Sequence, residues 1–171
     1  MQTQSAPEVW LRGPLPGVPP LLQPAAHALL QALEEINGFA AQINNSLIWE
    51  QPYNSASVAF HLQHITGFLD RLLTYARGEQ LTVQQLEYLA AEGQESGEVN
   101  LPALLAGVDR AIHAAITQFS HTEESTLTHT RFVGRNRLPS TVIGLLFHAA
   151  EHTQRHTGQL LMTCRILGST K

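Results

Sequence analysis

Apolar residues recur at intervals of three and four along four long segments of the chain, which is the spacing that gives an α-helix one apolar face. These segments run from about residue 24 to 43, from 55 or 57 to 77, from 100 to 119 and from 140 or 141 to 167. The links between them are short or moderate, and the sequence contains no internal repeat. The pattern predicts an all-α protein built as a four-helix bundle.

Residue types at the ends of these segments support the helix limits. Ser57 and Asn100 are expected to cap the second and third long helices, and Gly78 follows the end of the second. Thr82 and Gln85 have the spacing of a capping box, so we predict a short extra helix between the second and third long ones.

Two parts of the chain lack a helical pattern. Residues 1–21 contain five prolines and are predicted to form an N-terminal arm, which either docks through Trp10 and Leu11 or is disordered. The bundle domain is then residues 22–168. Between the third and fourth long helices the pattern weakens. Residues 128–133 are compatible with an extended segment, but we predict a loop there.

Composition narrows the class of protein. Apolar residues make up 43% of the 171 positions and charged residues 14%, which is typical of a globular domain. The net charge of −4 and the absence of a basic run give no reason to expect nucleic-acid binding. No segment has the roughly 20 apolar residues of a membrane span, and no secretory signal is recognisable, so we expect a cytoplasmic protein without membrane association. Cys164 is the only cysteine, which excludes an intrachain disulfide and a cysteine-based zinc knuckle.

Histidine is the residue type that departs from ordinary composition, and five of the nine histidines lie in two short segments. In the last predicted helix, His148, His152 and His156 are spaced four apart, so at about 100° per residue they share an arc of roughly 80°. Neighbouring members lie about 6 Å apart at Cβ, and two such imidazoles can reach one ion at about 2.0–2.1 Å. Leu145 and Leu160 share this arc, so we expect the histidines to face the bundle interior.

The second segment lies in the second long helix and contains His61 and His64. His64 is flanked at helical spacing by Phe60 and Phe68, which is compatible with a side chain that points into the bundle. His61 lies on another part of the helix, so the two cannot easily bind the same ion. A pair of histidines on one helix is a weak metal signature, but a third from a facing helix strengthens it. Three neutral imidazoles suit zinc, nickel or iron(II) and leave coordination positions open.

Two motifs resemble a known family. The second-helix sequence SVAFHLQHI (residues 57–65) and the last-helix sequence HAAEHTQRHTGQ (residues 148–159) are similar to those of the DinB/YfiT-like superfamily. The resemblance covers most of residues 22–167. It implies an up-down-down-up four-helix bundle, a homodimer, and metal ligands at His64, His152 and His156.

The resemblance also leaves points open. The family often has Arg after the last ligand, where this chain has Thr157, so substrate contacts cannot be carried over. Three roles remain open for His148: a fourth metal ligand, a residue that contacts a ligand without binding the metal, or a side chain that fills the cavity. His61 is a second candidate for contacting a ligand without binding the metal. Glu151 and Arg155 lie off the inward arc and are expected at the surface or at an interface. A second apolar strip on the last helix is either a dimer seam or the face that contacts another packed helix; it consists of Ile143, Phe147, Ala150 and Leu161.

The motifs and the resemblance leave three hypotheses for the function. The resemblance favours a metal-dependent transferase that joins a low-molecular-weight thiol, of the bacillithiol or mycothiol type, to a small electrophile. An open three-histidine site also suits a metal-dependent hydrolase, because a bound ion lowers the pKa of its water to near 7. The third hypothesis is a non-catalytic metal-binding protein of the stress response. Zinc or nickel is the first expectation for the ion, with iron or manganese as alternatives, and no general base can be assigned from the motifs.

Overall fold

The fold was analysed in a computed structural model, which describes residues 6–40 and 42–169. Five α-helices and two short strands occur in these described residues. In chain order they are α1 (Gln23–Ala40), α2 (Val58–Arg77), α3 (Val83–Ala91), α4 (Leu101–Ser120), β1 (Thr130–Val133), β2 (Leu138–Thr141) and α5 (Val142–Ser169).

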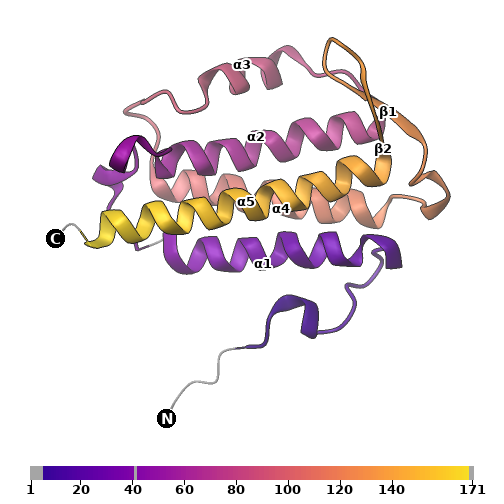
Figure 1. The fold of residues 1–171 in the computed structure, drawn as a ribbon, viewed down its shortest axis with the longest axis horizontal. Coiled ribbons are helices and arrows are strands. Elements are labelled where there is room, and N and C mark those ends of the chain that lie inside the picture. Colours follow the sequence, from indigo (N-terminus) through magenta and orange to yellow (C-terminus); the bar gives the residue numbers. More distant parts are fainter. Residues whose placement is uncertain (1–5, 41, 170–171) are drawn as a thin grey trace.

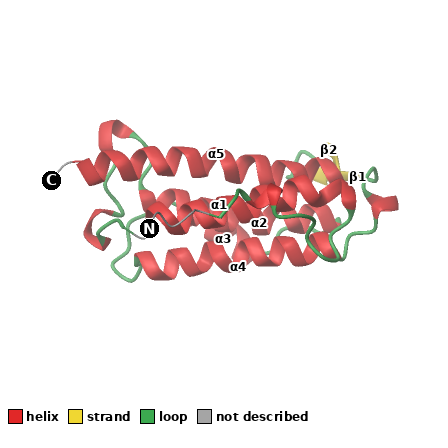
Figure 2. Cartoon of the chain, turned by 90° about the horizontal axis from the view of Figure 1, so that it is seen from below, coloured by secondary structure: helices red, strands yellow, loops and turns green. Residues whose placement is uncertain are grey.

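The four long helices α1, α2, α4 and α5 form the predicted bundle (Figure 1). α1 and α5 run in one direction along the long axis, and α2 and α4 run in the other. α5 packs against both α1 and α2, and α4 packs against the same two helices from the other side. The all-α, up-down-down-up four-helix architecture is therefore confirmed, and the second view shows its elongated shape (Figure 2).

Local sequence sets the helix limits as expected. The Ser57 side chain accepts a hydrogen bond of 3.1 Å from the Phe60 N–H at the start of α2, and Gly78 ends this helix with a positive φ of 84°. The inward side chains pack into one core. Its largest fully buried members include Leu29, Ile36, Leu62, Ile65, Leu69, Ile112, Phe119, Leu146 and Leu160. Among the described residues, no helix combines the length and the apolar character needed to cross a bilayer.

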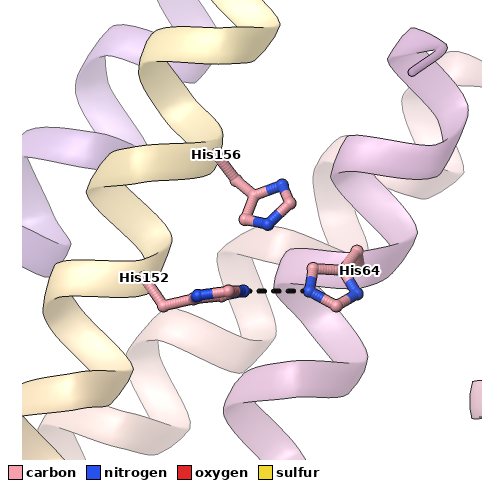
Figure 3. A group of neighbouring side chains, drawn as sticks. All are labelled: His64, His152 and His156. Atoms are coloured by element: carbon pink, nitrogen blue, oxygen red, sulfur yellow. Dashed lines mark hydrogen bonds between the residues drawn. The ribbon is translucent and has the colours of Figure 1, made fainter. Parts of the chain in front are cut away.

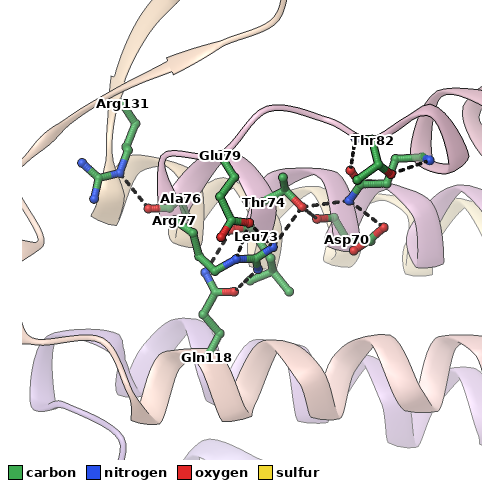
Figure 4. A network of polar contacts seen from close by, with 10 residues as sticks. Asp70, Leu73, Thr74, Ala76, Arg77, Glu79, Thr82, Gln118 and Arg131 are labelled. Atoms are coloured by element: carbon green, nitrogen blue, oxygen red, sulfur yellow. Dashed lines mark hydrogen bonds and ion pairs between the residues drawn. The ribbon is translucent and has the colours of Figure 1, made fainter.

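The short helix α3 is attached to the outside of α2. Its N-terminus has the predicted capping box, in which Thr82 and Gln85 bond each other's backbone N–H groups. The Gln85 amide also donates to Asp70 and Thr74 of α2, at 2.8 Å each. Figure 4 shows Thr82, Asp70 and Thr74 together in this polar network. All nine residues of α3 are described and none of them is buried, so polar contacts fix its position.

The segment before α5 differs from the expectation of a loop. β1 and β2 pair as an antiparallel hairpin, in which Thr130 faces Thr141 and Val133 faces Leu138. The strands are four residues long and lie at the surface, so they carry no strong alternation of apolar and polar positions. The hairpin is also held to α2, because the Arg131 side chain donates to the Ala76 carbonyl at 2.8 Å (Figure 4).

The N-terminal arm docks on α1, but not through the residues expected. Trp10 remains 60% exposed and Leu11 is exposed as well, whereas the neighbouring Val9 is buried. The Val9 N–H donates to the Gln31 side chain at 2.9 Å, and an ion pair between Arg12 and Glu34 adds a second attachment. Residues 1–5 of the predicted arm lie outside the described residues.

Asn100 supplies a direct test of the capping at α4. Its side-chain oxygen accepts a hydrogen bond of 3.0 Å from the Ala103 N–H. Replacing Asn100 by Ala should lower the free energy of unfolding by about 1 kcal/mol, since this N–H loses its acceptor. Urea unfolding measures the effect, and Asn100→Asp is the matched control that keeps an acceptor. Equal stability of the Ala variant and the unmodified protein would contradict the assignment.

Candidate metal site

The structure brings together the three histidines expected to bind a metal. His64 projects from α2, and His152 and His156 project from adjacent turns of α5 (Figure 3). One ring nitrogen from each residue lies within 4.8 Å of the other two. The centroids of the rings are 4.5 Å apart for His64 and His156, 4.6 Å for His152 and His156, and 5.3 Å for His64 and His152.

The geometry and the donor atoms suit a transition-metal ion. The Nε2 atoms of His64 and His152 are 3.0 Å apart. Two nitrogens bound at about 2.0–2.1 Å to one tetrahedral ion lie about 3.3 Å apart. The two rings therefore need to move apart only slightly to bind one ion. The group contains three neutral nitrogen donors, which is a ligand set suited to zinc, nickel or iron(II). This three-histidine group could therefore hold a metal ion.

Burial keeps the imidazoles in the form that binds metals. Removal from water and, to a smaller extent, the proximity of the His64 ring together lower the pKa of His152 to about 4 and that of His156 to about 3. The pKa of His61, which touches His156, is lowered to about 4 for the same two reasons. These rings are therefore neutral near pH 7. Metal ions bind neutral histidine and compete with protons for it.

The ring nitrogens that face away from the group have unequal surroundings. His64 Nδ1 lies 2.7 Å from a carboxylate oxygen of Glu92, and His156 Nδ1 lies 3.0 Å from His61 Nδ1. His152 Nδ1 is buried and has no hydrogen-bond partner among the described residues. Partners of this kind orient metal-binding histidines and set their tautomers. The structure thus places His61 behind a ligand candidate, while His61 itself is not part of the three-histidine group.

Glu92 is the residue that sequence reasoning missed. It follows α3 in the link to α4, yet its side chain is just 4% exposed and contacts both His64 and Arg71. One signal was available: Arg71 lies seven residues after His64, on the same part of α2, and a buried arginine requires an acidic partner. Several glutamates follow α2 in the sequence, and the pattern does not distinguish among them.

Aromatic rings and a pocket surround the group. Phe60 stacks on His64 with a centroid distance of 5.3 Å, and Phe68 stacks on His152 at 4.0 Å. On the His61 side, a pocket of about 590 Å³ is lined by His61, Arg155 and other residues of α5. Pockets of this size accept small molecules. Its wall also includes Ser55, whose hydroxyl is buried and has no partner among the described residues.

His148 does not face the interior as its spacing suggested. Its side chain is 46% exposed and lies 3.0 Å from Glu151, which also pairs with the exposed Arg155. His148, Glu151 and His152 form a second, more exposed group whose ligand atoms lie within 4.8 Å of one another. His148 is therefore neither a cavity filler nor a member of the three-histidine group.

Two further residues of α5 are packed rather than available for chemistry. Thr157, which stands where the family often has Arg, is buried and donates from its hydroxyl to the Thr153 carbonyl at 2.8 Å. Cys164 is a buried free thiol, and burial raises its pKa to about 11. A thiol with so high a pKa is a poor nucleophile near neutral pH.

The assignment of ligands is tested by metal content. The double variant His152→Ala/His156→Ala and the single variant His64→Ala should fold but lose stoichiometric zinc after dialysis, because too few nitrogen donors remain. His148→Ala is the matched control on the same helix and should retain its zinc. Elemental analysis, with circular dichroism as the check on folding, measures both. Zinc loss in the control equal to that in His64→Ala would defeat the assignment.

The lowered pKa values also predict how stability depends on pH. Between pH 6.5 and about 4 the unfolded chain binds protons at His61, His152 and His156 that the folded chain does not. The free energy of unfolding of the metal-free protein should therefore be highest above this range and fall as the pH drops through it. Urea unfolding with a chelator at about pH 7.5 and about pH 5 measures the difference.

Two variants distinguish the contribution of the buried imidazoles from that of other groups that titrate in this pH range. His61→Leu should show a smaller loss between the two pH values, since one of the three buried imidazoles is gone. His113→Gln, a change at an exposed position, should behave as the unmodified protein does. Stability that stays constant across the range would show that these rings are not held neutral by burial.

Comparison with known proteins agrees with the fold and the histidine geometry. No curated protein matches the chain. The family profile described as the DinB superfamily matches residues 5–160, which is most of the sequence and includes all three histidines of the group. The chain belongs to the DinB superfamily.

Proposed function

We propose that this DinB-superfamily protein uses its three-histidine site to activate a low-molecular-weight thiol, of the bacillithiol or mycothiol type, for transfer to a small electrophile. The observation that carries the proposal is the convergence of three imidazoles, with no fourth histidine, cysteine or carboxylate in that group among the described residues. Three protein ligands are typical of catalytic sites, whereas structural zinc sites are usually closed by four. An open position can accept an external ligand.

The chemistry follows from this ligand set. When bound, a divalent ion held by neutral nitrogens favours ligation of a thiolate over a protonated thiol. The thiol releases its proton to solvent, and its sulfur forms a bond to the electrophilic carbon. The bond from that carbon to the leaving group breaks, and the leaving group takes the electron pair. His64, His152 and His156 hold the site, and the Phe60 and Phe68 rings limit the access of water to it.

The surroundings favour thiol transfer over hydrolysis. A hydrolase needs a base that takes a proton from the attacking water. The only buried carboxylate described at the site is Glu92, and its two oxygens contact His64 and Arg71 respectively. An ordinary thiol loses its proton near pH 8.5 and therefore needs less help than water does.

We propose that the substrates bind in the pocket beside His61, which none of the three candidate ligands lines but whose His61 ring contacts His156. Arg155 at its wall is a cation that suits an anionic group, and apolar side chains such as Met162 suit the rest of a small molecule. Low-molecular-weight thiols are kept reduced in the cytoplasm, where we expect the protein to act. We also propose a homodimer, with a seam on α5 around the exposed Phe147. Ala150 is buried within the protomer and cannot contribute to that seam.

A fluorescence assay tests the proposal. Zinc- or nickel-loaded protein is incubated with bacillithiol and monochlorobimane, and the rate of fluorescent conjugate formation is measured. The loaded protein should exceed both the metal-free protein and His64→Ala, and Glu87→Gln, a surface change on α3, should match the unmodified protein. Equal rates with and without metal would contradict thiol transfer. A metal-dependent rate on p-nitrophenyl acetate in the absence of thiol would instead favour the hydrolase.

A further inference from the structure

We propose that Glu92 is a positioning residue: it holds His64 in the tautomer that presents Nε2 to the metal, and helix α3 serves to deliver it. This inference rests on the metal site of the proposed function but not on thiol transfer. It concerns a carboxylate outside the three-histidine group, on an element that contributes nothing to the core of the bundle.

Hydrogen-bond chemistry fixes where the proton of His64 lies. Glu92 Oε2 is 2.7 Å from His64 Nδ1, and Glu92 Oε1 is 2.6 Å from Arg71 Nη1. Arginine can only donate and a carboxylate can only accept, so Arg71 holds the ionised carboxylate in place. His64 Nδ1 must then carry the hydrogen. In the form of the ring that carries one hydrogen, the form that binds a metal, the lone pair is then on Nε2, which faces His152.

The unpartnered atom of the neighbouring ring agrees with this assignment. His64 Nε2 and His152 Nε2 are 3.0 Å apart, so one of them donates to the other in the metal-free protein. If His64 Nε2 carries the lone pair, His152 Nε2 is the donor, and the second lone pair falls on His152 Nδ1. That atom is buried and has no partner among the described residues. A lone pair there avoids an orphaned buried N–H group.

The surface of α2 is shaped for the approach of Glu92. A Cβ atom at Gly67 would lie 2.5 Å from Glu92 Oε1, 2.6 Å from Arg71 Nη1 and 2.7 Å from Tyr88 Cδ1. These separations are far below van der Waals contact, so any larger residue at position 67 displaces the pair of charged side chains. Gly67 is buried in the middle of α2, where glycine lowers helix stability relative to alanine. The close approach explains why glycine stands there.

Polar contacts hold both ends of α3 against α2. Gln85 tethers its start, as described above, and the Tyr88 hydroxyl donates to the Gln63 carbonyl at 3.3 Å. Just after Glu92, the Gly93 N–H donates to the Gln63 side chain at 2.8 Å, with a positive φ of 80° at Gly93. The chain therefore turns immediately after Glu92 and is fixed on both sides of it. Through Glu92, the cap residue at the end of α3, this segment contacts His64 of the histidine group.

Glu92→Gln is the discriminating variant, because it keeps the shape of the side chain but offers one acceptor instead of two. Arg71 has only donors, so the amide oxygen should turn to Arg71 and the amide NH₂ group to His64. His64 Nδ1 then becomes an acceptor, and the hydrogen moves to Nε2, where it blocks metal binding. The affinity for zinc should fall by about 10–100-fold, which is the usual effect of losing such a partner. Glu87→Gln on α3 is the matched control and should bind zinc as the unmodified protein does.

Two measurements are made on each protein. Competition with a zinc chelator gives the affinity, and long-range ¹H–¹⁵N spectra of the metal-free protein give the tautomer of His64. We expect the hydrogen on Nδ1 in the unmodified protein and on Nε2 in Glu92→Gln. Gly67→Ala, which displaces Glu92 sterically, should lower zinc affinity in the same direction.

The outcomes are separable from those of the function assay. A His64 tautomer that does not change in Glu92→Gln, or a zinc affinity within about twofold of the unmodified protein, overturns the positioning role. The tautomer is read without metal or substrate, so it stands even if no thiol is transferred. Conversely, failure of the thiol assay with the expected tautomer and affinity changes would reject thiol transfer alone.

Discussion

Three imidazoles share a confined space between α2 and α5, and this space penalises a positive charge on the His152 and His156 rings. Burial and mutual proximity lower the pKa values of His152 and His156 well below that of a free imidazole. Neutral rings can lie side by side without repulsion, but each then has one nitrogen with a hydrogen and one without. The contacts of the outer nitrogens therefore decide which atoms are free to bind a metal. Glu92 and His61 contact these outer nitrogens, on His64 and His156 respectively.

The bundle brings the three rings together by placing two antiparallel helices, α2 and α5, next to each other. α2 contributes one ring and α5 contributes two rings one turn apart, so the group forms where the two helices face each other (Figures 1 and 3). α1 and α4 close the core on the remaining sides. α3 and the hairpin bury little apolar surface. The hairpin ties the start of α5 to α2, whereas α3 brings a charged side chain to a ligand candidate.

The sequence was sufficient for features that depend on local periodicity. The four long helices, the caps at Ser57 and Asn100 and the capping box at Thr82 follow from side-chain spacing and chemistry alone. The grouping of His64 with His152 and His156 was implied by the resemblance to the DinB/YfiT-like motifs, because helical spacing alone does not distinguish His148 from the other two histidines of α5. The hairpin was missed because its short surface strands are held by backbone pairing, which leaves no strong pattern in the side chains.

Features that depend on contacts between residues far apart in the chain could not be predicted from the sequence. His148 has the same spacing as the other two histidines of α5, yet its side chain is exposed and pairs with Glu151 instead of joining the group. Trp10 and Leu11 looked like the anchors of the arm, but the direction of a short helical turn buries Val9 instead. Glu92 contacts a residue 28 positions away, across a helix whose docking is polar. No periodic pattern encodes such a contact.

Anomalous diffraction from crystals of the zinc-loaded protein tests the central claim most directly. We expect a single strong peak between α2 and α5, about 2.0–2.1 Å from one nitrogen each of His64, His152 and His156. An ion bound instead by His148 and Glu151 at the exposed end of α5, with no peak between the two helices, would contradict the account.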